Sequence, residues 1–176
     1  MIAANLFKTI GGFDEHFMPI LEDVEFSHRL KEKNYQLLMD EAIQVQHIFN
    51  FNLLRSLKNG FTKSKYWTRY SIANKDLLSD SGTASQGLKF NVVSCFLSLF
   101  LLLGAITIGL AYLAVPVLLL LVANLLLNRS LIHAFYKTKG LGFTVLAVLY
   151  YMMLYPLAVG LGALSGLINH LSGSAL

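Results

Sequence analysis

Residues 11–23 read GGFDEHFMPILED and end on an acidic pair, Glu22-Asp23. Apolar residues around and after the pair recur at spacings that place them on one face of a helix. The acidic side chains of this segment come early and its basic side chains come late, an order that suits both ends of the helix macrodipole. The sequence therefore predicts a helix that begins at the pair, with charged carboxylates in its first turn.

Further short motifs follow in a fixed order. After the GGFDE turn at residues 11–15 and the Glu22-Asp23 pair come Arg29-Leu30, Asn34-Tyr35, Ala42 and His47. This arrangement resembles the C-terminal half of the catalytic domain of family-two glycosyltransferases of the GT-A type. The family has a glycine where this chain has Asn34, and asparagine accepts the left-handed backbone that such a turn needs.

The resemblance implies an α/β remnant of a GT-A (Rossmann-like) domain over residues 1–49. Residues 35–39 and 43–45 have the apolar content of short strands. Residues 1–12 read as a short helix or strand that ends in a glycine turn. The family's nucleotide-binding half, with its Asp-x-Asp metal motif, has no counterpart ahead of Gly11, so we expect a truncated enzyme or one half of a split enzyme.

The resemblance also implies roles for single residues. Asp23 would be the general base, with Glu22 beside it as the second catalytic residue. Mg²⁺ or Mn²⁺ would be held mostly by the absent half, and His47 is a candidate to help hold it, although a histidine after a strand is as readily structural. The acceptor side of the cleft would be shaped by Gly11, Gly12 and Asp14.

A simpler interpretation of the acidic pair remains open. Carboxylates are favoured in the first turn of helices in general, so a plain helix start explains Glu22 and Asp23 without any catalysis. Arg29 is expected to be structural and to pair with a nearby acid.

The composition of the whole chain differs from that of an ordinary soluble domain. Of 176 residues, 55% are hydrophobic and only 14% are charged, which points to a membrane protein. Residues 1–49 hold eight acidic and four basic residues, whereas residues 50–75 hold six basic residues and no acidic one. The single cysteine, Cys95, excludes an intrachain disulfide.

Residues 50–87 predict a basic amphipathic helix and a linker at the membrane surface. Aromatic and aliphatic residues interleave with bases, and Gly60 could divide the segment into two helices. The same pattern suits nucleic acid or a solvated basic helix, but the apolar runs that follow favour the membrane, and no nucleic-acid partner is expected. The surface residues would be Arg55, Lys58, Lys63, Lys65, Trp67 and Arg69.

Residues 88–171 predict about three transmembrane helices, near 90–111, 114–135 and 141–168. The run from 90 to 128 is uncharged over 39 positions, far more than the roughly 20 residues that one span needs, so we expect a turn between Tyr112 and Pro116. A second kink is expected at Pro156. The small residues Gly162 and Gly166 suit close helix packing, either between spans or between copies.

Charge bias predicts the orientation. All lysines and arginines fall on one side of a three-span arrangement, which places the N-terminal region in the cytoplasm and the chain after Leu171 on the opposite face. The chain would thus be a multi-pass protein of the inner (cytoplasmic) membrane, with its acidic helix among cytosolic sugar nucleotides.

Together these features predict the C-terminal portion of a membrane-bound inverting glycosyltransferase of the cell envelope. Its partners would be membrane lipid, a nucleotide-sugar donor, a lipid-linked or polysaccharide acceptor and, for a split enzyme, a separate nucleotide-binding half. The alternative is a non-catalytic membrane accessory subunit, or an inactive fragment that lacks the nucleotide-binding half.

Overall fold

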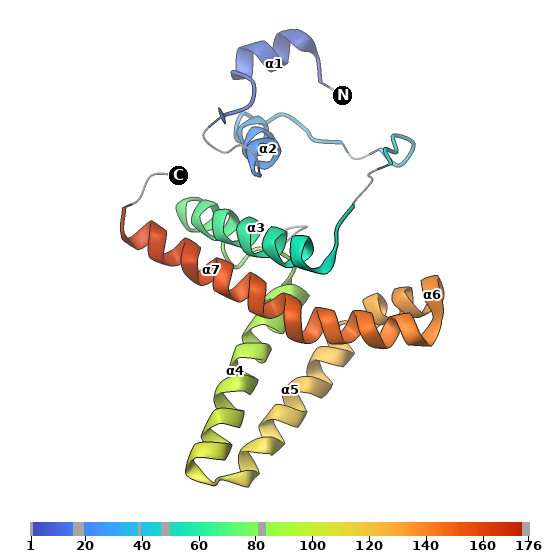
Figure 1. The fold of residues 1–176 in the computed structure, drawn as a ribbon. Helices are drawn as coiled ribbons and strands as arrows, with labels where there is room; N and C mark the ends of the chain where they lie inside the picture. Colours follow the sequence, from blue (N-terminus) through green and yellow to red (C-terminus); the bar gives the residue numbers. More distant parts are fainter. Residues whose placement is uncertain (1, 16–19, 39, 47–49, 81–83, 174–176) are drawn as a thin grey trace.

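A computed structural model describes residues 2–15, 20–38, 40–46, 50–80 and 84–173 (Figure 1). Over these residues all regular secondary structure is helical, and no β-strand occurs. A 3₁₀ turn at Ala111–Leu113 and a π-helical turn at Tyr150–Leu154 interrupt the α-helices. The α-helices are α1 (Ala4–Ile10), α2 (Glu22–Glu32), α3 (Leu53–Ala73), α4 (Gln86–Ile108), α5 (Ala114–Leu127), α6 (Arg129–Leu149) and α7 (Tyr155–Leu171).

The expected α/β remnant is wrong. Residues 35–38 and 43–45, the described parts of the two expected strands, are irregular and exposed, with Leu38 89% and Val45 86% exposed. A strand persists only when its N–H and C=O groups pair with a neighbour. No second strand lies beside these segments in the described part of the chain, so apolar content alone does not make them a sheet.

The helix predicted at the acidic pair is confirmed, since α2 begins at Glu22 and carries its acids in the first turn. Ahead of it, α1 ends at Gly11, whose φ of 102° is the left-handed conformation that glycine adopts at low cost. After it, Asn34 takes a φ of 62°, as expected for the residue that stands where the family has glycine.

Aromatic rings join α1 to α2. The rings of Phe7, Phe13 and Phe26 lie with centroids 5.2–5.4 Å apart, in edge-on and tilted geometries that such rings prefer. Phe26 also belongs to a small core with Ile10 and Leu30, each only 6% exposed. These contacts hold α1 on one side of α2 and leave the other side free to face α3.

Helix α3 is continuous, so the possible break at Gly60 is wrong. Gly60 is buried against the ring of Tyr155, where a side chain would collide. Figure 1 shows α3 and α7 side by side, and their contact is the most extensive in the fold. Gly162 and Gly166 of α7 lie directly on the backbone carbonyls of Phe61 and Lys65. The close packing predicted for these glycines is therefore confirmed, but its partner is α3, the predicted surface helix, and not another span as expected.

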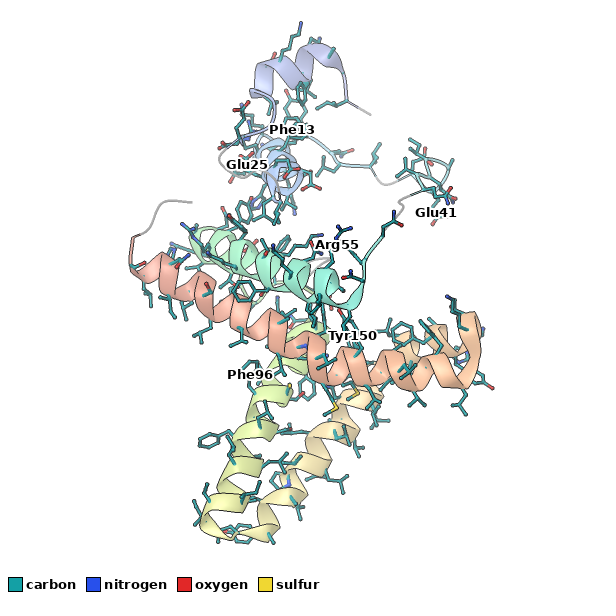
Figure 2. All side chains as sticks on the ribbon, in the orientation of Figure 1. Phe13, Glu25, Glu41, Arg55, Phe96 and Tyr150 are labelled. Atoms are coloured by element: carbon teal, nitrogen blue, oxygen red, sulfur yellow. The ribbon has the colours of Figure 1, made fainter. Side chains whose placement is uncertain are left out.

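Helices α4 and α5 form an antiparallel hairpin that projects away from α3 and α7 (Figure 1). Its chain reversal lies at residues 109–113, where a turn was expected, and Pro116 sits within the first turn of α5. Large apolar side chains point outward along the hairpin; Phe100 is 73% and Ile106 79% exposed (Figure 2). An apolar surface of this kind needs a hydrocarbon environment or a partner.

Buried amides fix the base of the hairpin. Asn124 Nδ2 of α5 donates to Asn91 Oδ1 (2.7 Å) and to Ser94 Oγ (2.9 Å) of α4. Asn91 Nδ2 donates in turn to the backbone carbonyl of Tyr151 (2.6 Å), and Asn128 Nδ2 donates to Asn124 Oδ1 (2.7 Å). Because Asn91 is fully buried and Asn124 is 3% exposed, each amide depends on these partners.

The expectation of about three spans is corrected. Among the described residues, two stretches are long and apolar enough to cross a membrane, Gln86–Ile108 and Arg129–Leu171. Helix α5 has 14 residues, about 21 Å of helix, short of the roughly 30 Å of a hydrocarbon core. The second stretch is not one straight helix, because Lys139 and Gly140 leave helical geometry.

The expected kink at Pro156 falls just before that residue. Pro156 is the second residue of α7, and the π-helical turn precedes it. Proline lacks an N–H and crowds the preceding turn. Widening that turn relieves the crowding and leaves the carbonyl of Tyr151 available to Asn91.

We expect Gly162→Ala to destabilise the protein, because the new methyl group would overlap the carbonyl of Phe61. Overpacking of this kind costs about 1–3 kcal/mol. Gly142→Ala in α6 is the matched control, since its methyl group would meet no atom within 4 Å. It should be neutral or slightly stabilising, because alanine favours helix. Thermal unfolding in detergent measures both, and equal midpoints would contradict the packing.

Candidate functional site

A cavity of about 340 Å³ lies where the start of α2 meets α3, α4 and α7. Asp23 and Val24 line it from α2, and Asn59, Lys63 and Trp67 line it from α3. Its remaining wall comes mainly from Leu88, Tyr155 and Val159. A carboxylate, an ammonium group, an amide and an indole thus share one cavity with apolar side chains from the two stretches that are long and apolar enough to cross a membrane.

Asp23 is exposed at this cavity and held in place by its own helix. Its Oδ1 accepts the backbone N–H of Val24 (2.8 Å), and its backbone carbonyl accepts the hydroxyl of Ser27 (2.7 Å). The first turn of a helix favours a negative charge. One carboxylate oxygen is thereby used locally, and the cavity gives a ligand access to the side chain.

Glu22 lies next to Asp23 but is not part of the cavity wall. Its Oε2 is buried and has no hydrogen-bond partner. The structure thus separates the two predicted catalytic residues: Asp23 faces the cavity, and Glu22 flanks it with one oxygen still able to accept a hydrogen bond.

Arg29 organises the turn ahead of the site. Its Nη1 donates to the carbonyl of Ile10 (2.7 Å), its Nη2 donates to that of Gly12 (2.5 Å), and its Nε pairs with Glu25 (2.5 Å). The guanidinium therefore ties the end of α1 to the second half of α2. This matches the structural role expected for Arg29.

The other residues suggested by the resemblance do not gather at this cavity. Gly11, Gly12 and Asp14 lie in the connection after α1, outside the cavity wall. His47 lies outside the described residues. Among the described residues, no group of three or more His, Cys, Asp or Glu side chains could hold a metal ion. This part of the chain therefore does not fit a Mg²⁺ or Mn²⁺ site by itself.

The six residues of α3 that were predicted to face the membrane surface lie in three environments. Arg55, Lys58 and Lys63 are exposed, as a membrane-surface role requires. Lys65 and Trp67 are half-buried, and Arg69 is buried, lining a smaller cavity of about 210 Å³ beside α2. The contacts of α3 with α7 and its proximity to α2 explain this division, which a helix viewed in isolation does not reveal.

Sequence reasoning missed a link between α2 and α3. His28 Nδ1 and the hydroxyl of Tyr70 are 2.8 Å apart and join the two helices. Burial, reinforced by the charges of Glu25, Asp76 and Glu32, raises the pKa of Tyr70 to about 12. The phenol is therefore neutral in ordinary assays. No short sequence motif marks a pair 42 residues apart.

No protein-family model, curated protein or solved structure matches this chain.

We expect Tyr70→Phe to loosen α2, because it removes this hydrogen bond. A loss of about 1 kcal/mol should raise amide exchange in α2 roughly fivefold. Hydrogen–deuterium exchange measures it, with Tyr66→Phe on the preceding turn of α3 as the control that should leave α2 unchanged. Unaltered exchange in the Tyr70→Phe protein would show that this link does not hold the helix.

Proposed function

We propose that this chain is the C-terminal portion of a membrane-bound inverting glycosyltransferase that acts in the cell envelope. It would transfer a sugar from a nucleotide-sugar donor to a lipid-linked or polysaccharide acceptor. The observation that carries the proposal is the position of Asp23, at a cavity between an acidic first turn and a basic helix beside apolar helices. The motif order of residues 11–47 supports it independently.

Asp23 would act as the general base. As an acceptor hydroxyl attacks the anomeric carbon, a new C–O bond forms and the hydroxyl proton passes to the Asp23 carboxylate. The bond from that carbon to the diphosphate oxygen breaks, and the nucleoside diphosphate leaves with the electron pair. A single displacement of this kind inverts the anomeric centre. Glu22 would flank the base without contacting the acceptor, because its Oε2 is buried and it does not line the cavity.

The donor would be bound elsewhere. The described residues do not build a divalent-metal site, so we propose that a separate nucleotide-binding half holds the diphosphate and its Mg²⁺ or Mn²⁺. That half would meet this chain on the side of α2 where Asp23 is exposed. A non-catalytic membrane subunit remains the second candidate, and the apolar hairpin and basic helix favour it as much as they favour the enzyme.

We further propose a multi-pass arrangement in the inner membrane with the N-terminal region in the cytoplasm. Lys89 and Arg129 flank the base of the α4–α5 hairpin, whereas its tip at residues 109–113 carries no charge. Basic residues favour the cytoplasmic face. For the return crossing we propose the 3₁₀ turn together with α5, Ala111–Leu127, at the short end of the range for a span. With the chain back at the hairpin base, α7 would lie on the cytoplasmic side next to α3, and the region after Leu171 with it, which reverses the orientation expected for that region from charge bias alone.

Asp23→Asn should reduce transfer at least a hundredfold in the assembly that includes the nucleotide-binding half, because an amide cannot take the proton. Donor affinity should stay unchanged. Glu22→Gln is the control and should do less harm. If Asp23 only stabilised the helix terminus, about 0.3–1 kcal/mol of stability would be lost and turnover spared. Turnover within tenfold of the parent would exclude Asp23 as the base.

Cysteine labelling in sealed inverted membrane vesicles tests the orientation. In a Cys95→Ala background, Lys58→Cys and His170→Cys should react with an impermeant maleimide from the cytoplasmic face. Tyr112→Cys, 65% exposed at the hairpin tip, should react only from the opposite face. Labelling of His170→Cys from the opposite face alone would mean that α7 crosses the membrane.

A further inference from the structure

A second cavity of about 260 Å³ continues the cavity of Asp23. The two share Ser64, Trp67, Ala84, Leu88 and Val159 in their walls, so they adjoin along these side chains, and we treat the two together as one groove. The second part is almost wholly apolar and lies between the start of α4, α3 and α7. Its own lining includes Leu77, Leu78, Val92, Val93 and Ala163.

The groove changes character along its length. At one end Asp23 supplies a carboxylate, and the same cavity holds the ammonium group of Lys63 and the amide of Asn59. Lys63 is exposed and forms no salt bridge with another described residue. Trp67, whose ring suits a boundary between apolar and wet surroundings, lines both parts. A ligand that fills the groove would therefore carry a polar, anionic end in the first cavity and an apolar end in the second.

We propose that the groove binds a sugar carried on a single-chain lipid phosphate. Its chain would lie against Val92 and Ala163, its phosphate against Lys63 and Asn59, and a hydroxyl of its sugar beside Asp23. The last contact rests on the proposed function, while the binding of the phosphate and the chain does not. The inference selects the lipid-linked acceptor over the polysaccharide.

The geometry favours a lipid that enters sideways from the bilayer. Val93 is 64% exposed and Leu78 81% exposed at the apolar end of the groove. Val93 belongs to α4, one of the stretches apolar enough to cross a membrane. The second cavity, about 260 Å³ and lined mainly by apolar side chains, has room for part of one lipid chain.

Photo-crosslinking tests the inference on the intact chain in phosphatidylcholine nanodiscs. The probe is an isoprenyl diphosphate N-acetylglucosamine with a diazirine in its chain. We expect labelled peptides from α4 around Val93 and from α7 around Ala163. Lys63→Gln should reduce labelling at least fivefold by removing the charge, and Val93→Trp should do so by filling the groove. Because Val93 is largely exposed, the larger side chain should be tolerated by the fold.

Matched controls separate the groove from general membrane affinity. Lys58→Gln, also exposed on α3 but outside both cavities, and Val115→Trp, 59% exposed on α5, should keep labelling within twofold of the parent. Excess unlabelled phosphatidylglycerol should compete poorly. Equal competition by that lipid, or equal losses in the control variants, would overturn the proposal and leave the groove as ordinary lipid contact.

The binding assay and the transfer assay can fail separately. Groove labelling with no transfer by the complete assembly would support lipid binding and refute the glycosyltransferase. Transfer to an acceptor without any labelling of α4 or α7 would support the enzyme and refute the groove.

Discussion

The fold depends on the backbone contact between α7 and α3. Gly162 and Gly166 have no side chains to hold the helices apart, so α7 rests directly on the carbonyls of Phe61 and Lys65. Close approach of this kind is what small residues permit between apolar helices. Ser64 Oγ, which donates to the carbonyl of Val159 at 2.7 Å, adds a polar tie within the same interface. The candidate cavity depends on this contact, because the contact fixes the positions of the cavity walls on α3 and α7.

The amide network at the hairpin base supplies the next constraint. In low-dielectric surroundings a satisfied amide is held strongly, and an unpaired one is costly. Asn91 joins α4 to the π-helical turn before α7, while Asn124 joins α5 to α4. Phe96 of α4 also packs on Gly160 of α7 (Figure 2). Leu88 and Val92 lie within one helical turn of Asn91, so these contacts also place them in the groove wall.

Local signals in the sequence predicted local structure well. The start of α2, the left-handed Asn34 and the chain reversal before Pro116 follow from charge order, residue type and the length of the uncharged run. Local residue content could not establish whether residues 35–39 and 43–45 form strands, because a strand exists only when its backbone pairs with a neighbouring strand. The spacing of Gly162 and Gly166 indicated close packing, but nothing local identified α3 as the partner helix.

The same limit applies to the site. The sequence pointed to Asp23, yet Lys63, Asn59 and Trp67 join it only because α2 lies over α3. Glu22 and Asp23 are adjacent in sequence, but successive residues of a helix point in different directions, so one lines the cavity and the other does not.

Hydropathy likewise identifies a helix that is long and apolar enough to cross a membrane, but it does not show which of its faces packs against another helix. Leu161, Leu164, Ile168 and Leu171 are exposed on α7, whereas Gly162 and Gly166 face α3. One helix thus has an apolar face and a face closed by another helix. Figure 1 shows it crossing the direction of the α4–α5 hairpin rather than following it. A helix with such faces satisfies a span criterion on length and composition, although its most extensive contact is with α3, which carries the bases at the cavity.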